Sequence, residues 1–369
     1  MARIAITGAN GFVGRNLLWR LQEGGFGDVA VIDRTADDET IRGQLDGADL
    51  VIHLAGVNRT DDPAEFQNGN ADYTGRICAL AAATAKPPAI FYASTIRAAD
   101  PTDYGRSKLA AEAHVDAYGK STGAHVWNAR LVNIFGKWAR ADYNSAVATF
   151  CHNIARGLPI RVNDPAAPLT LLYVDDLADR LLSLVAGERP PSGMLDVGPV
   201  YQTTVGAVAD MLHAIAAGRT DLSVPATGTG LARALYATFI SYLPPEHFSY
   251  PVPVHSDPRG DFVEMLKTPD SGQFSYFTSA PGVTRGEHYH HSKVEKFLVL
   301  SGKAHFGFRH IESGERHEIV TEGGKPVIVE TIPGWTHNVT NIGDSELVVM
   351  LWANEVFDRQ RPDTMGMKV

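Results

Sequence analysis

The sequence predicts an α/β domain with a doubly wound parallel sheet, followed by an all-β domain of the barrel or jelly-roll type. In the first two-thirds of the chain, apolar runs alternate with helical segments in a βαβα order, which implies a parallel sheet. After the proline-rich stretch Pro244–Val254, short strand runs are separated by glycine and proline turns, a pattern that suits a small antiparallel barrel. We therefore expect two domains, at 1–245 and 246–369.

Charge and hydropathy exclude several classes of partner. A net charge of −9 over 369 residues argues against a nucleic acid or an anionic membrane surface, because both require a basic face. The sequence has no run of about 18 apolar residues, so no membrane span is expected. The first residues already read as a strand and turn, so we expect no signal peptide and a cytoplasmic location. Cys78 and Cys151 are expected to be buried, reduced side chains.

Hydrophobic periodicity places the elements in order. In the first domain the expected strands are Arg3–Thr7, Val29–Ile32, Leu50–Leu54, Ala89–Tyr92 and His125–Arg130. Helices are expected at Asn16–Gln22, Tyr73–Ala85 and Thr204–Ala217. In the second domain the expected strands are Phe262–Leu266, Lys296–Leu300, His305–His310, Pro326–Thr331 and Leu347–Trp352.

A glycine-rich turn, TGANGFVG, follows the first strand and opens the first helix. Glycines at this place allow a tight turn and a close approach of main-chain N–H groups to a pyrophosphate, as in a Rossmann-like fold. We expect a dinucleotide to contact Gly8, Gly11, Phe12, Val13 and Gly14. The alternative is a purely structural turn.

The end of the second strand carries Asp33 and Arg34, which give conflicting signals on the cofactor. An acid at this place usually binds the ribose 2′-hydroxyl of NAD, whereas a neighbouring arginine holds the 2′-phosphate of NADP. We favour NADPH bound by Arg34. The alternative is a solvated surface arginine.

Tyr104 and Lys108 form a Y-x3-K pair on one face of a helix and follow Ser94 and Thr95 at the end of a strand. A lysine ammonium lowers the pKa of a phenol, and a hydroxyl anchors the substrate oxygen, so Tyr104 is suited to giving a proton to a carbonyl. The glycine turn, the HLAG run ending at Gly56 and this pair resemble the extended short-chain dehydrogenase/reductase family.

The resemblance implies that Leu54, Ala55 and Gly56 line the cofactor, together with Tyr104 and Lys108. The matching hydroxyl in the family is the last of a short serine run, which is Thr95 here. Ser94 remains the alternative.

Two further segments resemble the nucleotide-sugar members of that family. These are the R-x2-N-x-F-G run at Arg130–Gly136 and the element LLYVDDLAD at Leu171–Asp179. Taken singly, each candidate substrate contact could have a purely structural role. Taken together, the candidates favour a nucleotide-sugar substrate over a small alcohol. The candidates are Arg130, Asn133, Asn144, Ser145 and Arg161.

The stretch Gly282–Gly302 reads G-x5-H-x-H-x4-E-x6-G, with His288, His290 and Glu295 at its polar positions, and His337 follows later. Alternation along a strand places the first two histidines on one face and His291 outward. Imidazoles and a carboxylate suit a divalent metal such as zinc. The alternative is a set of polar residues stacked in a barrel.

This spacing resembles the first metal motif of the cupin superfamily, and the resemblance covers Ser249–Val369, which implies a cupin barrel (jelly roll). The second motif departs from the family, because Pro333 and Gly334 are adjacent where one residue normally separates them. The segments Ser256–Glu264 and Thr284–His291 also resemble the sugar 3,5-epimerases, in which the residue matching His288 is a base and no metal is used. The sequence leaves His288 as base, ligand or both.

Over its whole length the chain resembles a family of bifunctional enzymes of capsule and O-antigen synthesis. Matching segments are HLAGVNR, FGKW, LPPEHFSYP, EKFLVLSGK and WANEVFD. The resemblance implies a UDP-4-keto-6-deoxy-N-acetylhexosamine substrate, epimerised at C3 by the cupin domain and reduced at C4 with NADPH. The product would be UDP-2-acetamido-2,6-dideoxy-L-talose, the precursor of UDP-N-acetyl-L-fucosamine.

Both component families imply a homodimer. Two rival hypotheses remain, namely a reductase of single activity with a structural cupin and a non-enzymatic sensor of NADP and sugar.

Overall fold

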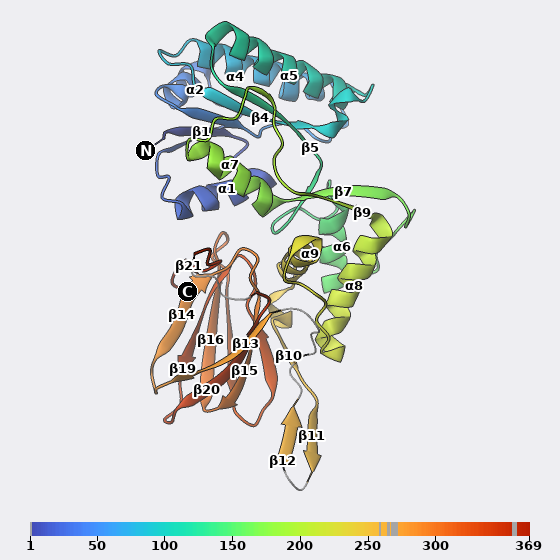
Figure 1. The fold of residues 1–369 in the computed structure, drawn as a ribbon, viewed down its shortest axis with the longest axis vertical. Coiled ribbons are helices and arrows are strands. Elements are labelled where there is room, and N and C mark those ends of the chain that lie inside the picture. The colour runs from blue at the N-terminus through green and yellow to red at the C-terminus, as the bar shows by residue number, and fades with distance from the viewer. Residues whose placement is uncertain (1, 258–259, 264–265, 267–271, 356–359) are drawn as a thin grey trace. The chain divides into compact units, whose positions relative to one another are not determined.

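The computed structural model describes residues 2–257, 260–263, 266, 272–355 and 360–369 (Figure 1). The chain divides into two compact units. Unit 1 comprises residues 1–134 and 170–202, and unit 2 comprises residues 135–169 and 203–369. The domain division predicted from the sequence, at 1–245 and 246–369, stays a prediction.

Unit 1 is built on a six-stranded sheet of order β2-β1-β3-β4-β5-β8, in which all neighbouring strands run parallel. The strands are β1 (Ile4–Thr7), β2 (Val29–Ile32), β3 (Leu50–His53), β4 (Ala89–Thr95), β5 (Val126–Leu131) and β8 (Gly193–Met194). The predicted parallel sheet is therefore confirmed. The chain reverses its direction of travel across the sheet between β1 and β3, and in such sheets ligands bind at the carboxyl ends of the strands beside this switch point.

Helices cover both faces of this sheet. They are α1 (Phe12–Glu23), α2 (Asp38–Leu45), α3 (Pro63–Phe66), the π-helix η1 (Gln67–Asp72), α4 (Tyr73–Ala82), the 3-10 helix η2 (Ile96–Ala99), α5 (Asp103–Thr122) and α7 (Val174–Val185). Side chains of β1 alternate between two cores, so that Ile4 and Ile6 pack with α1 and α7, whereas Ala5 packs with α2, α4 and α5. This alternation produces the predicted doubly wound arrangement.

Strand β4 is longer than the sequence indicated. It continues to Thr95 because Ala93, Ser94 and Thr95 keep their parallel pairing with β5. The two candidate hydroxyl residues therefore lie on the sheet itself, with their side chains on opposite faces.

The β-strands of unit 2 form two five-stranded antiparallel sheets, of order β10-β18-β15-β20-β13 and β17-β16-β19-β14-β21. The first contains β10 (Ser249–Pro251), β13 (Gln273–Ser279), β15 (Glu295–Ser301), β18 (Val327–Glu330) and β20 (Leu347–Ala353). The second contains β14 (Thr284–Tyr289), β16 (Lys303–His310), β17 (Arg316–Glu322), β19 (Trp335–Asn341) and β21 (Met365–Gly366). The antiparallel all-β region is thus confirmed.

A separate hairpin pairs β11 (Val254–Asp257) with β12 (Gly260–Val263). The expected strand Phe262–Leu266 and the epimerase-like segment Ser256–Glu264 lie partly outside the described residues.

Six strands of unit 2 were not predicted from the sequence, namely β10, β11, β13, β17, β19 and β21, and β14 was expected only as a strand without bounds that carries His288 and His290. Their composition explains this, since β19 reads WTHNVTN and β14 contains Gly286 at φ 96° and Glu287 at φ 59°. Strand β14 is also irregular between Gly286 and His288, where its register against β19 shifts. Polar residues and a bulge of this kind weaken the alternation from which strands are recognised.

Unit 2 also contains α6 (Ala146–Ala155), α8 (Val205–Asp221), α9 (Gly230–Ile240) and the short 3-10 helix η3 (Pro245–His247). Arg219 of α8 makes an ion pair with buried Glu330, and Lys296 binds the other oxygen of that carboxylate and donates a hydrogen bond of 2.7 Å to the Tyr250 hydroxyl. This buried cluster links α8 to the first sheet. Removing one of its charged residues would leave an uncompensated buried charge, which is strongly destabilising.

Three short strands, β6 (Asn133–Phe135), β7 (Pro168–Tyr173) and β9 (Val200–Thr204), pair in the order β6-β7-β9 at the points where the chain passes from one unit to the other. No helix in the described part of the chain is long and apolar enough to cross a membrane. Cys78 and Cys151 are buried free thiols, as expected.

Candidate functional site

The glycine turn of unit 1 packs against the segment that follows β3. Gly8 has a φ of 71°, and a Cβ added to it would lie 2.6 Å from the main-chain nitrogen of Ala55. A Cβ at Gly14 would collide with the carbonyl oxygen of Gly8. Both positions therefore require glycine. The turn and residues 54–56 meet at the switch point, where the fold places a dinucleotide.

At the end of β2, Asp33 and Arg34 are both exposed. The carboxylate of Asp33 accepts hydrogen bonds from the main-chain nitrogen and the hydroxyl of Thr35, at 2.8 and 2.6 Å, and these bonds lower its pKa. The Arg34 guanidinium lies against the main chain of Gly69, where an added Cβ would be 2.7 Å from its terminal nitrogen. Asp33 is thus engaged locally, and Arg34 offers a cation at this strand end.

His53 joins the carboxyl ends of β1 and β3. Its two ring nitrogens contact the hydroxyls of Thr7 and Thr74, at 2.5 and 2.9 Å. Because the Thr74 hydroxyl donates its proton to the Asn70 carbonyl, it accepts from Nε2 of the neutral ring, and Nδ1 accepts the proton of Thr7. Burial lowers the pKa of His53 to about 3, with a smaller effect from Lys108. His53 is therefore uncharged and bridges the hydroxyls of Thr7 and Thr74. The sequence analysis named it only as part of the HLAG run.

Tyr104 lies in the first turn of α5, whose N-cap is Thr102. Its hydroxyl donates to Asn58 Oδ1 at 3.3 Å. Burial raises the pKa of Tyr104, and a hydrogen bond with Thr95 and the charge of Arg97 oppose this. The expectation that the lysine would lower this pKa is not met in this state, since burial prevails. Asn58 is a contact that the sequence did not single out.

Lys108 is buried one helical turn further along α5. Its ammonium donates a hydrogen bond of 2.6 Å to the carbonyl of Ala93 and lies 4.5 Å from the ring centre of Tyr92. Burial lowers the pKa of Lys108 to about 7, and the charge of Glu112 opposes the shift. A Cβ at Gly56 would be 3.6 Å from this ammonium, which links the predicted cofactor segment to Lys108.

The two hydroxyl candidates have different partners. Ser94 donates a hydrogen bond of 2.5 Å to buried Glu112, which also receives the Arg130 guanidinium at 3.0 and 2.8 Å. Thr95 instead forms the hydrogen bond with Tyr104. Arg130, a predicted sugar contact, is therefore paired with a carboxylate inside unit 1. Glu112 was missed because a glutamate inside a helical pattern carries no distinctive signal.

The other predicted sugar contacts are distributed over both units. Asn133 in β6 belongs to unit 1 and donates a hydrogen bond of 3.1 Å to the Thr170 carbonyl. Ser145 is the N-cap of α6 in unit 2 and accepts from Ala148 N at 3.2 Å. Asn144 and Arg161 are exposed side chains of unit 2.

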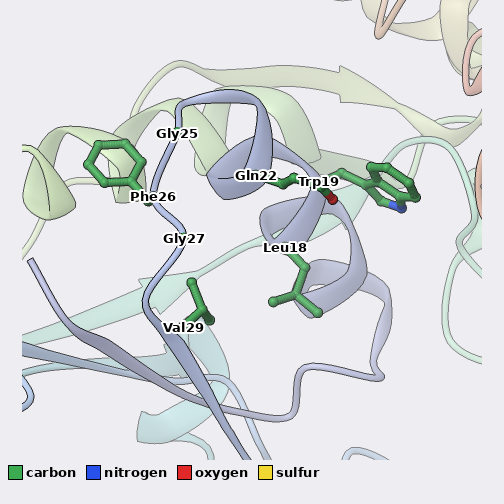
Figure 2. A pocket seen from close by; sticks show the side chains of 7 residues that line it. All are labelled: Leu18, Trp19, Gln22, Gly25, Phe26, Gly27 and Val29. Atoms are coloured by element: carbon green, nitrogen blue, oxygen red, sulfur yellow. The ribbon is translucent and has the colours of Figure 1, made fainter. Parts of the chain in front are cut away.

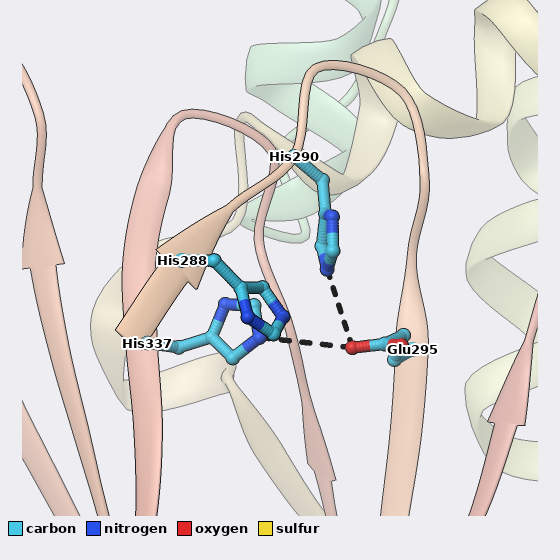
Figure 3. Close-up of side chains that lie close together, drawn as sticks. All are labelled: His288, His290, Glu295 and His337. Carbon is cyan, nitrogen blue, oxygen red and sulfur yellow. Dashed lines mark hydrogen bonds and ion pairs between the residues drawn. The ribbon is translucent and has the colours of Figure 1, made fainter. Parts of the chain in front are cut away.

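In unit 2 the predicted metal ligands converge (Figure 3). One ligand atom from each of the four residues lies within 4.8 Å of those of the others, and all but one of the residues are buried. The cluster comprises His288 at the end of β14, His290 in the following loop, Glu295 at the start of β15 and His337 in β19. His288 and His337, 49 positions apart in the sequence, lie side by side because β14 pairs with β19.

The strand that carries the first histidine ends at Tyr289, so alternation does not govern the residues after it. His290 reaches the cluster from a loop. His291 was expected to point outward, but its side chain is buried, with 2% of its area exposed, and its ring centre lies 5.6 Å from that of Tyr289. The side chain is therefore covered and not exposed, and His291 is not a member of the metal cluster.

Glu295 is the centre of the cluster. One of its oxygens lies 3.2 Å from Nε2 of His290 and 3.6 Å from Nε2 of His337, and the other lies 3.2 Å from the Lys293 ammonium. Burial alone would raise the pKa of Glu295, but His290, His337 and Lys293 outweigh it, and the pKa is well below its usual value. The group is therefore an anion in a buried site.

The histidines are suited to metal binding because they carry lone pairs. Burial, followed by the neighbouring histidines, lowers the pKa of His288 to about 3, and burial also lowers that of His337. The Nδ1 atom of His337 is buried without a hydrogen-bond partner in the described part of the chain, and its Nε2 lies 3.6 Å from Glu295, beyond hydrogen-bond distance. A buried nitrogen of this kind is costly unless it meets a donor or a cation. The donor set of imidazoles and one carboxylate therefore fits a zinc-type ion.

A pocket in unit 1 has a different character (Figure 2). It lies beside the C-terminal half of α1 and the start of β2, away from the glycine turn, and it has no ionisable lining residue. Its lining residues are Leu18, Trp19, Gln22, Gly25, Phe26, Gly27 and Val29. The pocket thus lacks groups for acid–base chemistry or metal binding.

Two family models match different parts of the chain. Residues 4–198 match the model of the NAD dependent epimerase/dehydratase family, and residues 255–365 match the polysaccharide biosynthesis C-terminal domain. The chain is 50% identical over 367 residues to the UDP-2-acetamido-2,6-β-L-arabino-hexul-4-ose reductase of Pseudomonas aeruginosa, covering 100% of this chain and 99% of that protein.

Two solved structures extend the comparison. The capsular polysaccharide assembling protein CapF from Staphylococcus aureus is 39% identical, with 100% of each chain covered and a TM-score of 0.66. UDP-glucose 4-epimerase from Thermotoga maritima is 21% identical, with 58% of this chain and 82% of that chain covered and a TM-score of 0.52, which shows the shared fold alone. The chain therefore belongs to the NAD dependent epimerase/dehydratase family, in the branch that also contains the Pseudomonas reductase and CapF.

Proposed function

We propose that this protein is a bifunctional nucleotide-sugar enzyme of surface polysaccharide synthesis. The sugar is UDP-2-acetamido-2,6-dideoxy-4-hexulose, which the all-β part of unit 2, a cupin barrel, epimerises at C3 and unit 1 reduces at C4 with NADPH. The product is UDP-2-acetamido-2,6-dideoxy-L-talose. The observation that carries the proposal is full-length identity of 50% to a protein named as a hexul-4-ose reductase. The histidine cluster supports the added epimerase step.

In the reductase step the nicotinamide, when bound, supplies a hydride to C4. Tyr104 donates its proton to the C4 oxygen, and Thr95 holds that oxygen by a hydrogen bond. The raised pKa of Tyr104 favours this direction, because a general acid must be protonated at the start. Lys108 anchors the cofactor ribose beside Gly56. Proton donation by a positioned side chain contributes about 10²- to 10⁴-fold to the rate.

For the cofactor we propose NADPH, with Arg34 binding the 2′-phosphate. Thr35 holds the Asp33 carboxylate through two hydrogen bonds, which leaves the guanidinium of Arg34 as the charge presented to the ribose. The glycine turn and residues 54–56 bind the pyrophosphate and the nicotinamide half. A phosphate paired with arginine is bound by charge-assisted hydrogen bonds.

For the epimerase step we propose that His290, Glu295 and His337 hold a zinc ion and that His288 is the base. The bound ion supplies a Lewis acid that polarises the C4 carbonyl. His288 is the least buried member of the cluster and carries a free lone pair at neutral pH, so it is able to take the C3 proton. A proton from solvent then adds to the opposite face of C3 and completes the inversion. Three protein ligands would leave one position of a bound zinc ion open, as in catalytic zinc sites.

The order of the two steps follows from the chemistry of the ketone. The proton at C3 is acidic only while C4 is a ketone, because the carbanion is then stabilised as an enolate. Reduction at C4 removes this stabilisation and preserves the new configuration. One ketone therefore serves both reactions, which gives a reason for their fusion in one chain.

The proposed contacts of the UDP-sugar are Asn133, Asn144, Ser145 and Arg161. Arg130 is proposed to support Ser94 through Glu112 as well as to face the substrate, since its side chain is partly exposed. The homodimer expected from the resemblance stays a prediction, which analytical ultracentrifugation tests.

The decisive experiment separates the two activities by isotope exchange. In heavy water without NADPH, the purified protein should introduce deuterium at C3 of the 4-keto sugar, observed by mass spectrometry and NMR. Tyr104→Phe should abolish NADPH oxidation and leave this exchange, whereas His290→Ala should weaken exchange and metal content and leave the reductase site intact.

Each other outcome identifies a rival function. NADPH oxidation without exchange would indicate a reductase of single activity with a structural cupin. Failure of both reactions, with NADPH and the sugar still bound, would indicate a sensor. Exchange that survives loss of the histidine cluster would show that the epimerase site has been assigned to the wrong unit.

A further inference from the structure

The last described residues, 360–369, run along the edge of the sheet that carries two of the metal-site histidines. We call this segment the C-terminal strap. Its strand β21 pairs with β14, so that Gly366 lies opposite His288 and Met365 opposite Tyr289. The main-chain nitrogen of Met367 also donates a hydrogen bond of 2.8 Å to the Glu287 carbonyl. Figure 1 shows β21 and the C-terminus at the end of β14.

Asp363 in the strap binds the loop between two proposed ligands, His290 and Glu295. Its carboxylate accepts hydrogen bonds from three successive main-chain nitrogens, those of residues 291, 292 and 293, at 2.9, 2.7 and 2.7 Å. It also accepts from the Ser292 hydroxyl at 3.1 Å. Successive N–H groups that converge on one anion fix the course of a loop, because each bond is charge-assisted. The loop that carries His290 is thus held by a residue about 70 positions away.

The same residue contacts His290 through its main chain. The carbonyl oxygen of Asp363 is hydrogen-bonded to Nδ1 of His290. A carbonyl only accepts, so the proton must be on Nδ1. The Nε2 atom is hydrogen-bonded to Glu295, 3.2 Å away, and with the ring proton held on Nδ1 it is the nitrogen whose lone pair would be offered to a bound ion. The strap therefore selects the tautomer that a metal ligand requires.

Further contacts attach the strap beside the remaining ligands. The hydroxyl of Thr336, next to His337, donates a hydrogen bond to the Met367 carbonyl. The Arg309 guanidinium donates to the Lys368 carbonyl at 2.6 Å, and the main-chain nitrogen of Val369 donates to Glu287 Oε2 at 3.1 Å. Contacts with β14, β16 and β19 mean that the strap is bonded to three strands of one sheet.

We propose that the C-terminal strap sets the metal affinity of the cluster and that Asp363 is its positioning residue. Asp363 acts through two groups: its carbonyl orients the His290 ring, and its carboxylate holds the loop from His291 to Lys293. The inference rests on the metal site of the proposed function and adds a determinant outside the ligand set. The sequence motifs did not indicate Asp363, because the strap lies C-terminal to both histidine segments.

The test compares metal binding by the full-length Asp363→Asn variant with wild type, by competition with a chromophoric zinc chelator. The amide keeps the size of the side chain but replaces one accepting oxygen with a donor that faces N–H groups. We expect the affinity for zinc to fall about 10- to 100-fold, the usual effect of losing a partner that orients a ligand. Asp344→Asn is the matched control, because Asp344 is exposed in the same unit and its substitution removes the same charge.

A second measurement does not depend on metal. Nitrogen-15 NMR of the histidine rings in the metal-free protein should show a proton on Nδ1 of His290 in wild type and a mixture of ring states in Asp363→Asn, because the main-chain carbonyl that accepts from Nδ1 shifts once the carboxylate no longer holds the strap to the loop. Asp363→Glu retains the carboxylate and should recover part of the zinc affinity. A purely structural role of Asp363 would lower the melting temperature without changing the tautomer.

The outcomes separate this inference from the proposed function. Unchanged zinc affinity and an unchanged tautomer in Asp363→Asn would overturn the role of the strap and leave the epimerase proposal standing. Failure of the wild-type protein to bind zinc would overturn both. Loss of affinity in the Asp344→Asn control to the same extent would assign the effect to net charge and would also refute the strap.

Discussion

The hydroxyl of Ser94 donates a hydrogen bond of 2.5 Å to the carboxylate of Glu112, so it is engaged away from the proposed reaction centre. Its neighbour Thr95 forms the hydrogen bond with Tyr104. We therefore expect Thr95→Val to lower kcat of ketone reduction by about 10²- to 10³-fold, the usual effect of losing one donor to a reacting oxygen. The measurement is steady-state NADPH oxidation with the 4-keto sugar.

Ser94→Ala removes a hydroxyl from the adjacent position and is the matched control. It should leave kcat within a few-fold of wild type and lower the free energy of unfolding by about 1 to 3 kcal/mol, because a buried carboxylate loses a donor. The reverse pattern, with Ser94→Ala inactive and Thr95→Val active, would assign the substrate anchor to Ser94.

The pH dependence of the reductase should reflect Lys108. Burial lowers the pKa of this side chain to about 7 in the native protein, so Lys108 loses its charge as the pH rises through that value. Since kcat/KM reports the free enzyme, we expect kcat/KM for NADPH to decline above about pH 7. Measurements between about pH 6 and pH 9 test this.

Glu112→Gln supplies the control for that assignment. The charge of Glu112 raises the pKa of Lys108, so its removal should move the decline to lower pH. A flat profile in wild type, or a shift to higher pH in the variant, would contradict the role of Lys108.

Cofactor choice should depend on Arg34. Arg34→Ala should raise KM for NADPH by about 10- to 100-fold, since a hydrogen bond to a charged group contributes about 1.5 to 3 kcal/mol. KM for NADH should change little because NADH lacks the 2′-phosphate. Arg42→Ala, at an exposed position on α2, should leave both values unchanged. An equal effect of Arg34→Ala on the two cofactors would refute the proposed phosphate contact.

Metal removal should affect one activity and the stability of one unit. Treatment with a chelator should abolish C3 exchange and leave the reduction of a ketone already epimerised at C3. Zinc at about 100 times its Kd should stabilise the metal-free protein by about 2.7 kcal/mol, visible as a rise in Tm. His337→Ala should remove this rise, and a Tm independent of zinc in wild type would show that the cluster is not a metal site.

Local sequence determined much of unit 1. Every expected strand of the parallel sheet is present, because buried parallel strands are short apolar runs bounded by turns. The glycine turn was recognisable for the same reason, since Gly8 and Gly14 occupy positions where any Cβ would collide with main-chain atoms. These features depend on residues close together in the chain.

Other features required the tertiary structure. The choice between Ser94 and Thr95 depends on which of the two side chains points toward Glu112 of helix α5, because neighbouring residues of a strand point to opposite faces of the sheet. The raised pKa of Tyr104 comes from burial, which no local pattern reports. Strand β19 was missed, and β14 was expected without bounds, because their polar residues and bulge conceal the alternation.

By itself, the sequence determined the two fold classes, the glycine turn, the Y-x3-K pair and the spacing of His288, His290 and Glu295, since each depends on local periodicity. The sequence also named His337 as a metal-site residue, but only the tertiary structure shows that it lies opposite His288 and that Asp363 holds the His290 loop. Both contacts join residues far apart in the chain through antiparallel strand pairing, and the register of that pairing is set by the packing of the whole unit.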